Sequence, residues 1–220
     1  MMAPDAEIYD YRVFGEEGWD IDDAIYTSII EACFDGVDII NMSLGGRFPS
    51  PAIQTAVQYA HSQGVIVVAA AGNEGDGDDF TVERSFPALW DEAISIAAVK
   101  KENNLPAVYF SNTNPQVDYA GIGVDVVSFK PGGGFQQMSG TSMAAPHVCG
   151  LLTALLDKEH GNKHMMANIF NKKSHDETLR NFINKHYCID IGLKGADHST
   201  GLGFLTYLNK KEFDKAFDDL

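Results

Sequence analysis

The chain has few basic residues and no apolar run long enough to cross a membrane. Among its 220 residues, 16 are Lys or Arg and 31 are Asp or Glu, which gives a formal net charge of −15. Such a surplus of carboxylates argues against nucleic acid and anionic membrane surfaces as partners. Without a stretch of about 18 apolar residues, no membrane-spanning helix is expected.

Cysteine is also scarce. The three cysteines, Cys33, Cys149 and Cys188, are odd in number and widely spaced, so neither a disulfide framework nor a zinc site is expected. Cys33 and Cys149 lie in apolar helical runs and are predicted to be core thiols. The first 15 residues lack the basic and apolar regions of a signal peptide. These absences favour an intracellular location without deciding the compartment.

Helical and strand patterns alternate along the first part of the chain. Residues 22–36 ("DDAIYTSIIEACFDG") have one apolar helical stripe, and residues 37–43 ("VDIINMS") follow as a short apolar strand. Residues 49–64 ("PSPAIQTAVQYAHSQG") predict a second helix. Ser50 is placed to cap it and Pro51 to occupy its first position.

Three later segments predict further strands, and one predicts a long helix. Residues 65–73 ("VIVVAAAGN") are almost continuously apolar, as in a strand that a parallel sheet buries on both faces. Residues 93–99 and 124–129 predict more strands, and residues 141–159 a central helix without a polar face. This alternation predicts an α/β fold of three layers, with a mostly parallel sheet between helices.

No linker, internal repeat or low-complexity tract divides the chain. Residues 1–220 are therefore predicted to form a single domain. From about residue 161 onward the composition turns polar, so residues 161–220 are predicted to form a peripheral helical tail.

A serine stands where the long apolar helix begins, in Gly140-Thr141-Ser142. The free amides and the positive dipole end of a helix stabilise developing negative charge, which suits an attacking serine. Serine and threonine are also favoured there as ordinary helix caps. Both interpretations remain open on this segment alone.

A second polar segment, "AAAGNEGDG", follows the buried strand. Asn73 stands at the carboxyl end of that strand, where open α/β sheets bind ligands. Its side-chain amide can donate to an oxyanion, or the residue can simply form a turn. A nucleotide-binding loop is a third interpretation, although both GxGxxG and a P-loop lysine are missing. The carboxylates of Glu74, Asp76, Asp78 and Asp79 fit either a calcium site or a solvated loop.

A third segment, "NMSLGG", follows the strand predicted for residues 37–43. Gly45 and Gly46 leave room for another backbone to approach closely. An extended peptide can lie along such a segment by strand addition.

Taken together and in order, these segments resemble one family. "GTSMAAPHV" around Ser142, "AAAGN" ending in Asn73, and "DIINMSLGG" resemble the subtilisin-like serine proteases, or subtilases. So do "APDAEIYDYRV", "SFPALWDEAISIAAV" and "GLGFL". The resemblance covers residues 3–156 and, more loosely, continues to residue 205. It implies the subtilisin-like fold and a serine endopeptidase.

The resemblance also implies roles for individual residues. Ser142 would be the nucleophile, and Asn73 would be the side-chain oxyanion donor beside the amide of Ser142. The wall of the primary specificity pocket would be Ala70, Ala71 and Gly72. The segment that pairs with the backbone of a peptide or protein substrate would be Ser43, Leu44 and Gly45. Pro87 matches a position that is often cis, and His147 matches a structural helix position.

The family's other two catalytic residues have no counterpart here. In subtilases the order is Asp, His, Ser, yet no histidine precedes His61 and no Asp-Ser-Gly or Asp-Thr-Gly occurs. His198, beside Asp197, is the most tempting substitute, but adjacency in sequence says nothing of its reach to the serine. We therefore expect an N-terminally incomplete subtilase domain whose Asp and His come from an upstream segment or a second chain. The alternative is a non-catalytic homologue that binds extended peptides. No cofactor is implied beyond the open question of structural calcium.

Overall fold

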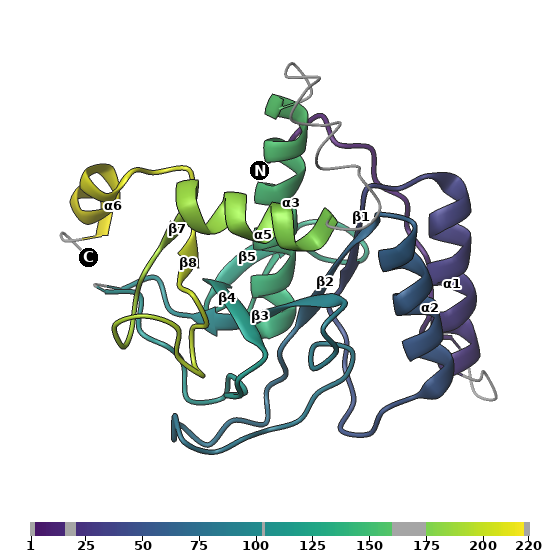
Figure 1. The fold of residues 1–220 in the computed structure, drawn as a ribbon, viewed down its shortest axis with the longest axis horizontal. Coiled ribbons are helices and arrows are strands. Elements are labelled where there is room, and N and C mark those ends of the chain that lie inside the picture. Colours follow the sequence, from purple (N-terminus) through teal and green to yellow (C-terminus); the bar gives the residue numbers. More distant parts are fainter. Residues whose placement is uncertain (1–2, 16–20, 103, 160–174, 218–220) are drawn as a thin grey trace.

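The computed structural model describes residues 3–15, 21–102, 104–159 and 175–217 (Figure 1). Its main sheet has the strand order β1-β2-β3-β4-β8-β7. The strands are β1 (Ile39–Met42), β2 (Ile66–Ala70), β3 (Ala93–Val99), β4 (Val117–Ile122), β7 (Cys188–Ile189) and β8 (Phe204–Leu205). Neighbouring strands from β1 to β8 pair in parallel, and β7 alone pairs antiparallel, with β8.

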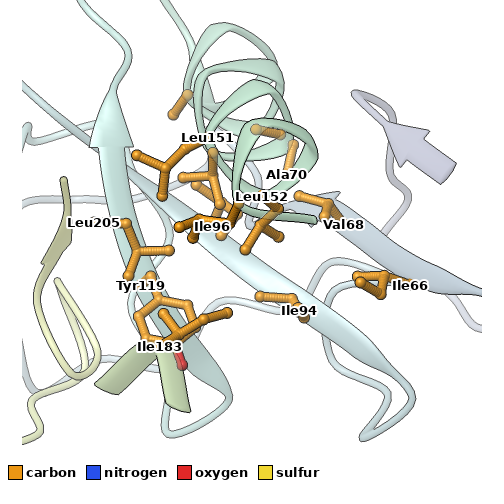
Figure 2. Packing of buried hydrophobic residues seen from close by; sticks show 14 of the residues in the cluster. Ile66, Val68, Ala70, Ile94, Ile96, Tyr119, Leu151, Leu152, Ile183 and Leu205 are labelled. Carbon is orange, nitrogen blue, oxygen red and sulfur yellow. The ribbon is translucent and has the colours of Figure 1, made fainter. Parts of the chain in front are cut away.

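Helices cover both faces of this sheet. On one face α2 (Pro51–Ser62) packs against β2 and α1 (Ile21–Asp35) packs against α2, and their apolar residues share one core with Val67 and Ala69 of β2. On the other face α3 (Thr141–Glu159) packs against the alternate residues of β2 and β3, and Ile183 of α5 (His175–His186) joins the same core beside Tyr119 of β4. Figure 2 shows Leu151 and Leu152 of α3 lying over Ile96. The predicted α/β fold of three layers, with a mostly parallel sheet, is confirmed.

Local sequence sets the helix boundaries as predicted. Ser50 precedes α2, and its hydroxyl accepts a hydrogen bond from the Ile53 amide at 3.5 Å. Pro51 occupies the first helical position, where its missing N–H leaves no donor unpaired. The long apolar helix begins at Thr141, so Ser142 lies in its first turn.

One central strand, β4, is not predicted from the sequence, whereas the strand predicted for residues 124–129 is present. Residues 124–129 contribute β5 (Val126–Phe129), which pairs only with β6 (Phe135–Met138) in a separate antiparallel hairpin. β4 carries Asp118 and Gly121, which are unusual in a buried strand. Asp118 is paired by Arg180 of α5, with Nη1 and Oδ1 2.9 Å apart, and Gly121 lets α3 approach. Neither reason is visible in the strand's own sequence.

The expected peripheral helical tail, residues 161–220, is corrected in two respects. Besides α5 and α6 (Lys210–Phe217), this region supplies β7 and β8, which extend the main sheet. Ile183 of α5 and Leu205 of β8 belong to the main core and are at most 1% exposed. The strands are only two residues each, too short to leave a period in the sequence. Residues 160–174 lie outside the described part.

All three cysteines are free and partly buried, less so than the core positions expected for Cys33 and Cys149. Burial raises the pKa of Cys149 to about 11 and that of Cys188 to about 12. Both thiols are therefore protonated and unreactive at neutral pH. Within the described residues, no helix combines the length and apolar character needed to cross a membrane.

Candidate active site

The site lies where the carboxyl ends of β1 and β2 meet the first turn of α3. Ser43 follows β1, Asn73 follows β2 after two residues, and Ser142 is the second residue of α3. The Gly140 amide donates to the Gly123 carbonyl at 2.7 Å, which ties the helix start to the end of β4. The structure thus brings together three segments that are far apart in the sequence.

Ser142 and Ser43 form a reciprocal pair of hydrogen bonds. The Ser142 hydroxyl donates to the Ser43 carbonyl at 3.1 Å, and the Ser43 hydroxyl donates to the Ser142 carbonyl at 2.8 Å. Asn41 Nδ2 in turn donates to the Ser43 hydroxyl at 3.0 Å. The Ser142 hydroxyl therefore does not cap α3. The Ser142 amide lies in the first turn, where no intrahelical acceptor exists.

Asn73 caps α3 from outside the helix. Its Oδ1 accepts from the Thr141 amide at 2.8 Å and from the Thr141 hydroxyl at 3.1 Å. The Thr141 hydroxyl also accepts from the Gly72 amide at 3.2 Å. With Oδ1 engaged, Asn73 Nδ2 has no hydrogen-bond partner among the described residues and lies at the same helix end as Ser142. Two such donors beside a serine hydroxyl have the chemistry that an oxyanion hole requires.

Thr141 belongs to the candidate site, although the sequence singles it out only as a possible cap. Its side chain is completely buried, and it links the Gly72 and Asn73 loop to the start of α3. Its place inside the Gly-Thr-Ser motif is the signal that could have identified it. A buried hydroxyl needs partners, and this one has both a donor and an acceptor.

The three residues predicted to wall a specificity pocket differ in exposure. Ala70 is 4% exposed and faces the α3 side of the sheet. Ala71 is completely buried with Ala97 and Val117 on the opposite side. Gly72 is partly buried and has a φ of +108°, which favours glycine. Their contribution to a pocket stays a prediction.

The segment predicted to bind substrate is held by a neighbouring loop. Leu44 is partly buried and packs against the α1 and α2 core, whereas Gly45 is exposed. Gly46 and Phe86 exchange two backbone hydrogen bonds of 3.0 and 2.8 Å. A Cβ on Gly45 would lie 2.4 Å from Ser85 Oγ, so glycine is needed for this approach. The Phe86–Pro87 bond is cis, as predicted.

His147 is placed as a structural residue. Its Nδ1 accepts from the Ile122 amide at 3.3 Å, and its ring lies 5.7 Å from that of Phe204. Burial lowers the pKa of the imidazole, so it is neutral at physiological pH. Its role as part of the core, inferred from the resemblance, agrees with these contacts.

The Asp197 and His198 pair is not arranged as a catalytic pair. The Asp197 carboxylate accepts from the amides of Leu193, Ser199 and Thr200, so it organises its own turn. His198 is exposed, and its carbonyl accepts from the Asn114 amide at 3.1 Å. Among the described residues, no histidine forms a hydrogen bond with Ser142. His160 and His164 lie outside those residues.

The carboxylates of the acidic loop after Asn73 accept hydrogen bonds both within the loop and from distant segments. Asp76 Oδ1 accepts from the Asp78 amide at 2.9 Å and from the Thr81 hydroxyl at 3.0 Å, and these bonds lower the pKa of Asp76. Asp79 accepts a hydrogen bond from the Ser199 hydroxyl. Within the described ranges, no group of three or more His, Cys, Asp or Glu side chains is arranged to hold a metal. Calcium binding stays an untested prediction.

Comparison with known proteins agrees with the resemblance. A model of the subtilase family matches residues 1–203. The chain is 35% identical over 217 residues to an intracellular serine protease of Paenibacillus polymyxa, covering 99% of this chain and 63% of the relative. It is 37% identical over 205 residues to the major intracellular serine protease of Bacillus subtilis (strain 168), covering 93% and 60%. Among solved structures, the S41 psychrophilic protease matches with a TM-score of 0.76 and 26% identity, covering 94% of this chain and 70% of that one. The chain thus spans 60–63% of the length of these two curated relatives.

Proposed function

Because the chain belongs to the subtilase family, we propose that it forms the part of a serine endopeptidase that carries the nucleophile, Ser142, and the oxyanion donor, Asn73. The observation that supports this most is the anchoring of Asn73. Its Oδ1 accepts from Thr141 at 2.8 Å, which leaves Nδ2 available at the helix end that bears Ser142. An amide held this way needs no reorganisation when charge develops.

The proposed reaction is acyl transfer followed by hydrolysis. Ser142 Oγ attacks the carbonyl carbon of the scissile peptide bond, and the carbonyl oxygen becomes an oxyanion. The Ser142 amide and Asn73 Nδ2 donate to that oxyanion. The C–N bond then breaks, the amine leaves with a proton, and water hydrolyses the ester on Ser142. Each half of the reaction needs a base to remove a proton from the nucleophile.

That base, in the proposal, comes from outside these 220 residues. The chain has no Asp-Ser-Gly, Asp-Thr-Gly or His-Gly-Thr motif. The Ser142 hydroxyl donates to a backbone carbonyl, Ser43 O, instead of an imidazole. An upstream segment or a second chain that supplies the aspartate and histidine would replace that contact with a base.

The substrate would be an extended peptide or protein segment along Ser43, Leu44 and Gly45. Ala70, Ala71 and Gly72 are small residues, so a pocket that they wall would accept larger side chains at the cleaved position. A peptide library should show a broad preference for such side chains. Strict preference for Gly or Ala would contradict this choice of pocket.

Turnover of a peptide substrate tests the proposed function. A segment carrying both missing motifs is supplied, fused in cis or as a separate peptide, and cleavage of an internally quenched peptide is followed. Cleavage should require the segment and should be abolished by Ser142→Ala. Ser62→Ala, which changes an exposed serine at the end of α2, should cleave normally. Activity that survives Ser142→Ala would contradict the assignment of the nucleophile.

A non-catalytic peptide-binding homologue is the second candidate. It is favoured by one observation, the donation of the Ser142 hydroxyl to Ser43 O in place of a base. In that case, the chain with the added segment would bind extended peptides and leave them intact. Binding is measured by fluorescence anisotropy of a labelled peptide, alongside the cleavage assay.

We also propose an intracellular location for the protein. Both curated relatives described above are named as intracellular serine proteases. The unpaired cysteines agree with a reducing compartment. Fractionation of the source cells, followed by immunoblotting, tests this assignment, and recovery from the medium alone would contradict it.

A further inference from the structure

A completely buried asparagine, Asn112, lies beneath the loop that presents Asn73. It belongs to the connection between β3 and β4, and its exposed fraction is 0%. Both ends of its side-chain amide are bound by Glu74. Oδ1 accepts from the Glu74 amide at 2.7 Å, and Nδ2 donates to Glu74 Oε2 at 3.0 Å. The Asn112 backbone amide donates to the Gly72 carbonyl at 3.1 Å.

The Glu74 carboxylate carries this contact to Asn73. The oxygen that accepts from Asn112, Oε2, also accepts from the Asn73 amide at 3.0 Å. Asn112 is therefore bonded to the residues on both sides of Asn73 and, through one carboxylate oxygen, to Asn73 itself. Hydrogen bonds to an ionised acceptor are roughly twice as strong as neutral ones, so this connection is stiff.

Gly72 shows how closely the loop wraps around Asn112. A Cβ at Gly72 would lie 2.2 Å from Asn112 Nδ2 and 2.6 Å from Glu74 Oε2. No side chain fits at those distances, and the φ of +108° also favours glycine. The loop and the buried asparagine thus form one packed unit.

Asn73 is held from two directions. Thr141 fixes the side-chain oxygen, whereas Asn112 and Glu74 fix the backbone. We propose that Asn112, acting with Glu74, is a positioning residue that sets where Asn73 Nδ2 meets the oxyanion. This inference rests on the proposed function of Asn73. Catalytic donors must be held within about 0.5 Å of their working position, and supporting residues of this kind provide that precision.

The expected effect has an upper limit. Removing one oxyanion donor costs about 10²–10³ in kcat, a figure established on a subtilisin itself and carried over here. A donor that remains but is displaced by about 1 Å costs up to about 10²-fold. Asn112→Ala and Glu74→Ala should therefore lower kcat by about 10- to 100-fold. KM should stay unchanged, because the oxyanion exists only during the reaction.

A double-mutant cycle separates positioning from a merely structural role. Asn112→Ala and Glu74→Ala are each combined with Asn73→Ala in the chain supplied with the missing motifs. Each should lose its effect on kcat once Asn73 is gone, because residues that act through one another are non-additive. Glu74→Gln should recover most of the rate, since one amide oxygen can accept both hydrogen bonds. Asp76→Asn changes a carboxylate whose hydrogen bonds, among the described residues, stay within its own loop, and it serves as the matched control.

An equal loss of kcat with and without Asn73, or a change confined to KM, would overturn the proposal. Glu74 is exposed, so its variants keep the test decisive if Asn112→Ala does not fold.

A second readout needs no turnover. In the 220-residue chain, the side-chain amide signals of Asn73, identified by their loss in Asn73→Ala, are followed by ¹⁵N-edited NMR. Asn112→Ala or Glu74→Ala should shift or broaden these signals, and Asp76→Asn should leave them in place. Unchanged signals in the first two variants would overturn the positioning role. An inactive but correctly supplied wild type would instead count against the proposed function, while the NMR result would still decide the role of Asn112.

Discussion

Replacement of Gly123 by alanine should loosen the start of α3. Gly123 lies just after β4, and its carbonyl accepts from the Gly140 amide at 2.7 Å. A Cβ at this position would lie 2.6 Å from the Ala98 Cβ and 2.8 Å from the Gly140 carbonyl oxygen. Both neighbours are constrained, because Ala98 is completely buried in β3 and Gly140 leads directly into the helix.

The size of the effect follows from these distances. Ordinary contacts of a Cβ begin at 3.4 Å, so the Gly140 oxygen is 0.6 Å and the Ala98 Cβ 0.8 Å too close. Overpacking of this kind in a rigid core costs about 1–3 kcal/mol. We therefore expect Gly123→Ala to lower the free energy of unfolding by that amount. Ser142 is two residues beyond Gly140, so the same displacement should also slow any reaction at its hydroxyl.

Urea unfolding followed by circular dichroism measures this change. Gly46→Ala is the control, because a Cβ on Gly46 would meet nothing within 4 Å. Its free energy of unfolding should stay within about 0.5 kcal/mol of the wild type. A Gly123→Ala variant as stable as the wild type would refute the close packing of β4 against the helix start.

Three further predictions concern the rest of the fold. Arg180→Met removes the bond to Asp118 at 2.9 Å and should lower the free energy of unfolding by about 2–3 kcal/mol in urea titrations, since the pair is mostly buried. Lys210→Met removes an exposed ion pair and should lower the free energy of unfolding by less than about 1 kcal/mol. Equal losses of stability in the Arg180 and Lys210 variants would contradict this prediction. Burial lowers the pKa of His147 from 6.5, so the unfolded state binds a proton first as pH falls. Stability should therefore decrease below about pH 6.5, and His147→Gln should reduce that slope in melts at several pH values; an unchanged slope would contradict it. The exposed rings of Phe129 and Phe135 stack at 5.2 Å, so changing both to Ser should reduce the fluorescence of a bound hydrophobic dye, and undiminished binding would place the exposed apolar surface elsewhere.

The fold could be predicted wherever local sequence decided the structure. β2 and β3 are apolar on both faces, as buried parallel strands must be, and α3 is apolar all round. β4 could not be predicted, because the partners that make Asp118 acceptable there include Arg180, 62 residues later in the chain, and the Ser95 amide of β3. A charged residue is compatible with a buried strand only when it has a partner, and the strand's own sequence does not reveal that partner.

The residues of the candidate site also differ in how far the sequence alone reveals them. Ser142 and Asn73 stand in short contiguous motifs, so their sequence neighbours identify them. Asn112 is an asparagine in a polar connection, which by itself indicates only a turn. Its partner, Glu74, is 38 residues earlier in the chain. Only folding shows that this residue lies under the loop that presents Asn73.

Labelling by a fluorophosphonate shows whether Ser142 is activated as a nucleophile. The probe forms a covalent bond with an activated serine, and mass spectrometry locates the adduct by residue. The 220-residue chain should react very slowly or not at all, because general-base assistance is worth about 10²–10⁴ in rate and no described histidine bonds to Ser142. Addition of a segment with the Asp-Ser-Gly or Asp-Thr-Gly and His-Gly-Thr motifs should restore labelling at Ser142, and Ser142→Ala should abolish it. Rapid labelling of Ser142 in the chain alone would contradict the account, because it would mean that a base is already present.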